Sequence, residues 1–309
     1  MPLTPEMAEL AERLRRWGRW GDDDEVGSLN LVDDAAARRG AAAVRTGRSF
    51  GLGVPLGPGS PQQGGAPRRF NPIHTMLSLH TAYVPGPGEA AFNDDMVVLP
   101  LSAGTHVDAL AHVAYDGRIW NGYPAEVVTS EAGATRCGAD ALRPVVSRGV
   151  LLDLPAALGV DRLEPGYAIG PDDLDAAVEH ARVQLAPGDV LLVRTGQMQL
   201  LHAGEVWAYN HDTPGLSVAS LEWVHRHEPG LVFTDTYVYE VWPPEDWSAI
   251  MAVHMISLRD MGQLQGQNAD LEALAAACAE DGVYECFISV APEPVTGGCS
   301  APVQPVAVR

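Results

Sequence analysis

The chain has 309 residues, of which 46% are hydrophobic, and its formal net charge is −20 at pH 7. A chain of this length can bury roughly 75% of the surface exposed by its unfolded state, which is enough for one large domain. The charge argues against nucleic acid and membrane surfaces as partners, and the absence of lysine among twenty basic residues excludes Schiff-base and P-loop sites.

Residues 1–50 predict an amino-terminal helical arm. Thr4 and Pro5 suit the N-cap and first position of a helix, and apolar residues recur at helical spacing from there until Gly18. A second helix is expected from about residue 33 to 44. No apolar run reaches the ~20 residues that span a bilayer, and the first residues lack a signal-peptide pattern, so we expect a cytoplasmic protein.

The rest of the chain predicts a loop followed by a catalytic domain. Residues 51–70 are rich in glycine and proline, which is typical of a mobile loop with a possible lid function. Residues 71–309 alternate strands with helices and show no internal repeat, which indicates a single mixed α/β domain. Strands are expected at 96–101, 149–154, 190–195, 231–235 and 284–291, and helices at 171–185, 217–227 and 269–280.

The stretch from Pro100 to His112 carries the strongest functional signal. Pro-Leu-Ser-Ala-Gly-Thr-His-Val-Asp-Ala-Leu-Ala-His favours a strand that runs into a loop, because proline, glycine, threonine and valine are poor helix formers. Side chains of an extended segment alternate between two faces, so Ser102, His106, Asp108 and His112 are expected on one face. Imidazole and carboxylate groups together suit a divalent ion such as Zn or Mn, or proton transfer.

At these residues the chain resembles the cyclase family that includes bacterial kynurenine formamidase and isatin hydrolase. That family's signature is His-x-Gly-Thr-His-x-Asp-x-x-x-His. The resemblance extends from about Asn71 to the carboxyl terminus, through Tyr115–Gly117, Asn121–Tyr123, Arg148–Asp153, Gly188–Gly196, His254 and Pro302–Pro305. It implies the swivelling β/β/α fold, a small-molecule substrate, and assembly as a homo-oligomer in which the amino-terminal arm can reach a neighbour.

The resemblance also implies a metal site, from which this chain departs at two positions. Its implied ligands are His106, Asp108 and His254. Ser102 stands where the family has its first histidine ligand, and Gln267 appears at the position of a later glutamate ligand. Both changes weaken binding of a dication, so occupancy by Zn or Mn is left open.

Five further residues are candidates for contact with substrate. Tyr115, Trp120 and Trp242 are aromatic residues that would accept a ring-bearing molecule. Asp235 and Glu240 resemble a recurring acidic pair of the longer family members, although salt-bridge or turn roles are equally open for them.

Two mechanisms, and a third reading without catalysis, remain open from the sequence. A metal held by His106, Asp108 and His254 would assist attack on an amide, lactam, formamide or ester carbonyl, while His112 moves protons. Without a metal, Asp108 would orient His106, and His112 would serve as a second proton carrier in ring closure, dehydration or isomerisation, for example in secondary metabolism. The third reading is a family member that binds a ligand without catalysis.

Overall fold

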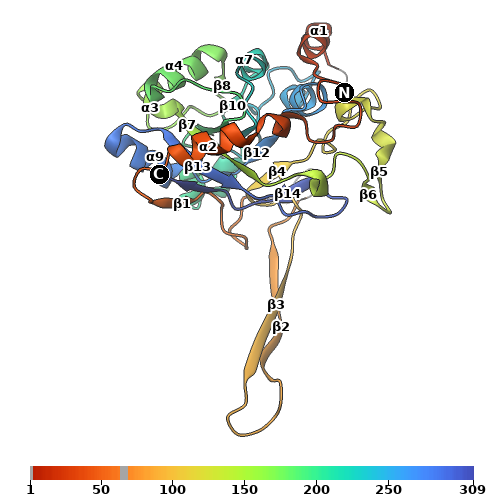
Figure 1. The fold of residues 1–309 in the computed structure, drawn as a ribbon, viewed down its shortest axis with the longest axis vertical. Coiled ribbons are helices and arrows are strands. Elements are labelled where there is room, and N and C mark those ends of the chain that lie inside the picture. Colours follow the sequence, from red (N-terminus) through yellow and green to blue (C-terminus); the bar gives the residue numbers. More distant parts are fainter. Residues whose placement is uncertain (1–2, 63–68) are drawn as a thin grey trace.

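The structure is a computed structural model that describes residues 3–62 and 69–309, and its centre is a nine-stranded mixed sheet (Figure 1). Across the sheet the strands are β1 (Ser49–Gly51), β15 (Val306–Val308), β13 (Glu285–Val290), β7 (Val145–Asp153), β9 (Val190–Arg194), β11 (Leu231–Thr234), β12 (Gln265–Gln267), β4 (His106–Asp108) and β14 (Ser300–Pro302). The four strands β7, β9, β11 and β12 are parallel to one another, and all the other neighbouring strands of this sheet are antiparallel.

Successive residues of the central strands enter two separate hydrophobic cores. Leu151 of β7 belongs to one core, together with residues of α9 (Glu272–Asp281), whereas its neighbours Val150 and Leu152 belong to the other. The second core also takes in residues of α4 (Pro171–Ala181) and α7 (Ser220–His227). Both faces of the sheet are covered, so the sequences of its central strands are continuous apolar runs. The expected single mixed α/β domain is confirmed.

Hydrogen bonds between side chains and backbone amides mark the starts of two helices. In α1 (Pro5–Leu14) the Thr4 hydroxyl accepts a hydrogen bond from the Met7 amide, and the helix ends four residues before the predicted stop at Gly18. In α4 the Asp173 carboxylate accepts from the Gly170 amide at 2.8 Å. The other helices are α2 (Asp34–Ala42), α3 (Leu154–Leu158), α5 (Met198–His202), α6 (Val206–Asn210) and α8 (Ala252–His254), and α8 continues as a π-helical segment, Met255–Asp260.

The amino-terminal arm packs on the body of its own chain. Leu14 is buried in the second core, and the Trp17 indole donates to the carbonyl of Arg259 at 2.7 Å. The last residues of the arm form β1, which extends the main sheet. The division of the chain at residues 50 and 70 stays a prediction, and residues 63–68 of the proposed lid loop lie outside the described residues.

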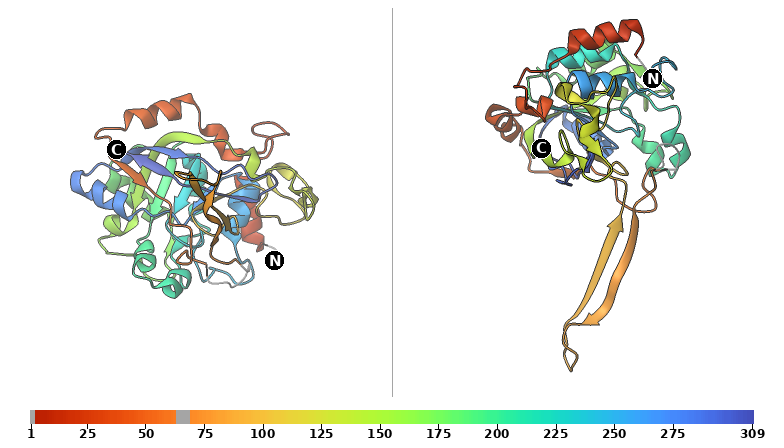
Figure 2. Two further views of the ribbon diagram at one scale, coloured as in Figure 1. Left: turned by 90° about the horizontal axis from the view of Figure 1, so that it is seen from below. Right: turned by 90° about the vertical axis from the view of Figure 1, so that its right-hand side faces the viewer.

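Four of the five expected strands occur close to their predicted positions, as β7, β9, β11 and β13. The strand predicted at 96–101 is wrong, because β3 (Ala91–Val98) ends earlier and belongs to a separate hairpin with β2 (Ile73–Ala82). This hairpin projects away from the body (Figures 1 and 2). Two further pairs are β5 (Val128–Thr129) with β6 (Gly133–Ala134) and β8 (Ala168–Ile169) with β10 (Gly215–Leu216).

Candidate active site

Three neighbouring strands bring the candidate residues together. In the register of the sheet, β4 lies between β12 and β14, so that Asp108 is paired with Gln265 on one side and with Ser300 on the other. His106 is paired with Gln267 in the same way. The expected alternation is present, since Val107 enters the hydrophobic core while its two neighbours face the polar cluster.

The opposite face of the motif holds the backbone in place. The Thr105 hydroxyl donates to the carbonyl of Asn268 at 2.6 Å and accepts from the amide of Val54 at 2.9 Å. The Asn268 side chain in turn donates to the carbonyl of Gly104 at 3.0 Å. These bonds tie the loop before β4 to the loop after β12, which fixes the direction in which His106 points.

His106 presents an unprotonated nitrogen to the cluster. Its Nδ1 lies 2.8 Å from the carbonyl oxygen of Gly104, which can only accept, so Nδ1 carries the proton. Its Nε2 is buried, has no hydrogen-bond partner and faces the Asp108 carboxylate at 3.5 Å. Burial lowers the pKa of His106 to about 4, although Asp108 opposes this shift, so the ring is neutral near pH 7.

His254 is held in the same tautomer by Glu240. The Glu240 carboxylate accepts from the His254 ring Nδ1 at 2.5 Å and from the backbone amides of Val253 and His254. The His254 Nε2 is therefore left to face the Gln267 amide nitrogen at 3.3 Å and the Asp108 carboxylate at 3.9 Å. Glu240 was predicted either to contact substrate or to serve in a salt bridge or turn, and its contacts with the start of α8 show that it positions His254.

Asp108 is the centre of the cluster. It is fully buried and accepts from the Ser300 hydroxyl at 2.9 Å, the Gln267 amide at 2.7 Å and the Gln265 amide at 3.3 Å. Burial alone raises the pKa of Asp108, but its interactions with His112, His106 and His254 outweigh that effect and hold the pKa below its usual range. The carboxylate is thus an anion whose lone pairs already face neutral donors.

His112 is the member of the cluster that solvent can reach. Its side chain is 22% exposed, compared with 0% for His106 and 3% for His254. Its Nδ1 lies 3.2 Å from the Ser300 hydroxyl, which donates to Asp108 and accepts from the Ser102 hydroxyl at 2.9 Å. Burial lowers the pKa of His112, with Asp108 opposing the shift, so a neutral imidazole is connected to the buried carboxylate through one hydroxyl.

Three residues missed by the sequence analysis lie beside the cluster. The Gln62 amide donates to the carbonyl of Ser102 at 3.3 Å, and its oxygen accepts from the Tyr237 hydroxyl at 3.1 Å. Burial lowers the pKa values of His106 and His112 and raises that of Tyr237, and the positive charge of Arg69 acts to lower all three, so its field reaches the cluster. Nothing in the spacing of these residues in the chain signals this arrangement.

Two of the predicted lining residues contact other parts of the molecule. Trp120 is fully buried, donates to Asp24 at 3.0 Å and lies so close to Gly262 that a Cβ there would meet its ring at 2.5 Å. Trp120 is therefore a core residue, which corrects its prediction as a residue that lines the substrate site. The Tyr115 hydroxyl donates to Asp260, and its ring lies 3.9 Å from the Arg259 guanidinium, beside the amino-terminal arm.

The remaining two predicted residues contact residues outside the cluster. Asp235 is fully buried and accepts from the amides of Thr195 and Gly196 and from the Thr195 hydroxyl, so it fixes the end of β9. This agrees with the turn role that the sequence left open for Asp235 beside substrate contact. Trp242 is half-buried and packs edge-to-face on Trp247 with ring centroids 5.7 Å apart, and its contact with substrate stays a prediction.

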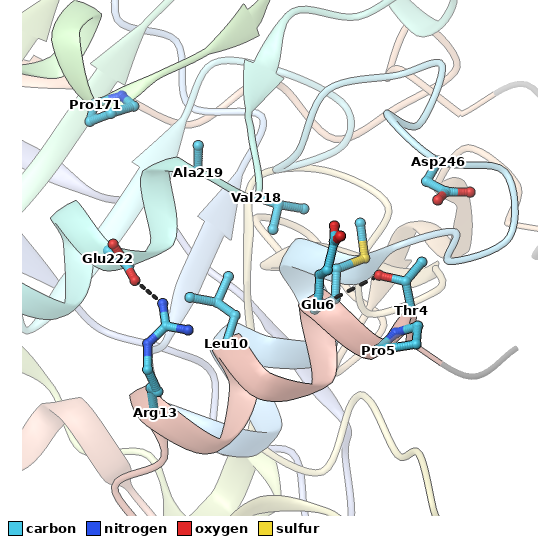
Figure 3. A pocket seen from close by; sticks show the side chains of 11 residues that line it. Thr4, Pro5, Glu6, Leu10, Arg13, Pro171, Val218, Ala219, Glu222 and Asp246 are labelled. Carbon is cyan, nitrogen blue, oxygen red and sulfur yellow. Dashed lines mark hydrogen bonds and ion pairs between the residues drawn. The ribbon is translucent and has the colours of Figure 1, made fainter.

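A hollow of about 730 Å³ lies elsewhere, between α1 and α7 (Figure 3). Its walls include Leu10, Val218 and the ion pair of Arg13 with Glu222. None of the residues of the β4 cluster lines it. We therefore base the candidate site on the arrangement of side chains around Asp108.

The residues at the implied metal site do not fit a dication in their present arrangement. The Gln267 amide donates to Asp108 while facing the lone pair of His254, and so it fills the position between two of the implied ligands. Ser102 donates to Ser300 and offers no imidazole. Within residues 3–62 and 69–309, no three His, Cys, Asp or Glu side chains are grouped so that they could hold an ion.

Comparison with known proteins agrees with this fold. The family model for Cyclase matches residues 50–241. The crystal structure of a protein described as a novel cyclase is 31% identical, with 100% of both chains covered and a TM-score of 0.89. Isatin hydrolase A from Ralstonia solanacearum is 19% identical over 85% of this chain and 92% of its own, with a TM-score of 0.64.

A more distant structure, described as a predicted metal-dependent hydrolase from Bacillus stearothermophilus, is 16% identical over 84% of this chain and 97% of its own, with a TM-score of 0.52. No curated protein matches the chain. The family match covers more than half of the chain, and the motif around His106 and Asp108 lies within it. The chain belongs to the Cyclase family.

Proposed function

We propose that this protein is a metal-independent acid–base enzyme that acts on a small, ring-bearing carbonyl compound, with His112 as its proton carrier. The observation that carries the proposal is the chain of contacts from His112 through Ser300 to Asp108, together with the exposure of the His112 ring. A neutral imidazole with one nitrogen tied to a buried carboxylate is a general base, because Asp108 stabilises the imidazolium that forms.

The roles of the three histidines follow from how deeply each is buried. His112 takes a proton from a water molecule or from an acidic carbon of the substrate, and Ser300 and Asp108 hold its ring in the required tautomer. The positive charge of Arg69, which acts with burial to lower the pKa of His112, would also stabilise negative charge that develops on the carbonyl oxygen. His106 and His254 are too deeply buried to meet a substrate directly, so they shape the field around Asp108.

Gln267 is the reason for preferring a mechanism without metal. A glutamate at this position would place a second carboxylate about 3 Å from Asp108, which a cation between the two or a proton on one of them would have to stabilise. The amide of Gln267 donates to Asp108 and supplies that stabilisation itself. The same reaction class, attack on a carbonyl with acid–base help, includes both hydrolysis and ring closure.

Metal-assisted hydrolysis is the second candidate, and one observation favours it. The buried Nε2 of His106 has no partner, and the two histidines each donate their Nδ1 hydrogen to an acceptor, which is the usual arrangement of metal-binding imidazoles. This candidate requires the Gln267 side chain to turn its oxygen inward.

One experiment separates the two candidates. Protein purified without chelator is analysed for bound metals and is then assayed against a panel of aryl formamides, isatins and aromatic lactones, with and without a strong chelator. We expect less than stoichiometric metal and turnover that survives the chelator. Turnover that is lost with the chelator and restored by Zn or Mn would replace the first candidate with the second.

The same panel tests the role of His112. We expect the His112→Ala variant to lose activity, while the His225→Ala variant, which changes a histidine of α7 away from the cluster, keeps it. Equal activity of the two variants would remove His112 from the mechanism.

A further inference from the structure

The loop that precedes β4 is held from a second element, the short helix α6. Tyr209 of α6 is fully buried in a small core beside Val54 and Met198. Its hydroxyl donates to the side-chain oxygen of Asn268 at 2.8 Å and also lies 3.2 Å from the backbone carbonyl of Asp235. Burial raises the pKa of Tyr209 well above its usual value, so the hydroxyl keeps its hydrogen and acts as a donor.

The orientation of the Asn268 amide follows from its two neighbours. Its nitrogen lies 3.0 Å from the carbonyl oxygen of Gly104, which can only accept, so the amide oxygen is the atom that faces the Tyr209 hydroxyl. Asn268 is fully buried and has a φ of 57°, a conformation that asparagine tolerates better than most residues. Removal of the Tyr209 hydroxyl therefore takes the donor from a buried amide oxygen, which costs more than the loss of an exposed bond.

The Gly104 carbonyl determines which ring nitrogen of His106 carries the hydrogen. A neutral imidazole has a single N–H, and this ring has two candidate acceptors: the Gly104 oxygen, 2.8 Å from Nδ1, and the Asp108 carboxylate, 3.5 Å from Nε2. An anionic carboxylate is the stronger acceptor, so the hydrogen stays on Nδ1 only while the carbonyl is held in its present direction. A glycine peptide has little stiffness of its own, so Gly104 depends on bonds from other residues for that direction.

The same helix is connected to the other end of this loop. Asn210, the residue after Tyr209, donates to the carbonyl of Pro61 at 2.7 Å. The side chain of Gln62, the residue after Pro61, donates to the carbonyl of Ser102 at 3.3 Å. Two consecutive residues of α6 therefore hold the loop from both of its ends, although α6 lies about a hundred residues further along the chain.

We propose that Tyr209 is a positioning residue of the candidate site, which selects the tautomer of His106. Its hydroxyl acts through Asn268 on the Gly104 carbonyl, so that a lone pair of the His106 ring faces Asp108. Without that hydroxyl the carbonyl is released, and the ring hydrogen moves from Nδ1 to Nε2, where it bonds to the carboxylate.

The consequence for turnover rests on the proposed function. There, Asp108 stabilises the imidazolium that forms at His112, through the hydroxyl of Ser300. A hydrogen bond from His106 would disperse the negative charge of Asp108 and weaken that support. The effect is comparable to one neutral hydrogen bond, so kcat should fall roughly 3- to 10-fold. KM should change less than about twofold, because a positioning residue does not touch the substrate.

The first test observes the His106 ring directly. Chelator-treated protein with ¹⁵N-labelled histidine is examined by long-range ¹H–¹⁵N NMR, which distinguishes a protonated from an unprotonated ring nitrogen, and His106 is identified by the signal that disappears in His106→Gln. The wild-type ring is expected to carry its hydrogen on Nδ1. In Tyr209→Phe, which keeps the aromatic ring and removes only the hydroxyl, the hydrogen should be on Nε2 in the larger part of the molecules.

The second test compares steady-state kinetics with a matched control. Tyr284 is also a buried tyrosine whose hydroxyl bonds to a histidine, since it lies 2.8 Å from Nε2 of His180, outside the cluster. Tyr284→Phe should therefore leave both the His106 signals and kcat unchanged, even if it lowers Tm as much as Tyr209→Phe does. If Tyr209→Phe does not fold, Asn268→Gly accepts the positive φ, removes the amide donor and should give the same His106 tautomer.

Three results would overturn the proposal. They are a His106 ring that keeps its hydrogen on Nδ1 in the variant, an unchanged kcat, and a loss of kcat that Tyr284→Phe shares. A moved hydrogen together with a lower kcat and a steady KM supports it. The NMR comparison needs neither substrate nor metal, so its failure is distinguishable from a failure of the proposed function, which the chelator experiment decides.

Discussion

The substitution Gln267→Glu tests the reasoning about the site most directly. In the wild-type protein the amide of Gln267 donates to Asp108 at 2.7 Å. The substitution replaces that donor by a carboxyl group with almost the same shape. Two ionised carboxylates about 3 Å apart repel by roughly 5 kcal/mol at an effective dielectric constant of ~20, so the introduced carboxyl is expected to keep its proton.

The loss of stability in the Gln267→Glu variant is set by the cost of keeping this proton on the introduced carboxyl group. A glutamate in the unfolded chain has a pKa of about 4.3, so holding it protonated at pH 7 costs about 1.4 kcal/mol for each unit of difference, or roughly 3–4 kcal/mol. Because the folded-state pKa is raised, stability is intact below pH ~4 and is lost as the pH rises. With an unfolding entropy of about 2.1 cal/mol/K per residue, a loss of this size lowers the Tm of this 309-residue chain by about 5–6 °C.

The assay is thermal unfolding of chelator-treated protein between pH 4 and 8, with Gln267→Met as the control. Methionine removes the hydrogen bond without a titrating group, so its effect should not change with pH. Adding Zn or Mn should restore the stability of Gln267→Glu, and more so when Ser102→His is combined with it. Equal stability of Gln267→Glu and wild type at pH 7 would refute the placement of the amide, and tight stoichiometric metal binding by the wild type would refute the weakened site.

Four further substitutions test three residues of the cluster and one buried carboxyl outside it. We expect His112→Ala to reduce turnover by roughly 100-fold or more with the fold intact, as measured by steady-state kinetics and circular dichroism, and an unchanged rate would contradict its role. His106→Ala and Asp108→Ala should not be additive in a double-mutant cycle, because both act through one network, whereas additive losses would give them separate tasks. Burial raises the pKa of Asp235 to about 7, although Thr195 opposes the shift, so wild-type stability should fall as pH rises from about 4 to 7, and Asp235→Asn should flatten that slope.

The elements that the sequence predicted well share a strong local signal. The runs that became β7, β9 and β11 are continuous apolar segments, which is what burial on both faces of a parallel sheet produces. The motif around His106 was predicted as a strand with its polar side chains on one face, and β4 has that form. Its match to the family was equally local, and the family assignment is confirmed.

Trp120 was wrongly predicted to line the site, because aromatic side chains give the same sequence signal in a core and in a pocket. Trp120 lies between Asp24 and Gly262, contacts that come from distant parts of the chain. The hairpin was missed for a related reason. Residues 73–82 have only a weak alternation of apolar and polar side chains. They form a strand that lies outside the main sheet, so neither of its faces is marked by burial in the core.

The role of Gln267 could not be predicted from the chain, because the substitution alone is consistent with two opposite outcomes. A glutamine that turns its oxygen inward remains a weak metal ligand, whereas one that turns its amide inward replaces the metal. The choice depends on the neighbours, since both Asp108 and the His254 Nε2 offer lone pairs to it. Glu240 fixes that tautomer of His254 from another segment, so the function of position 267 is decided 27 residues earlier in the chain.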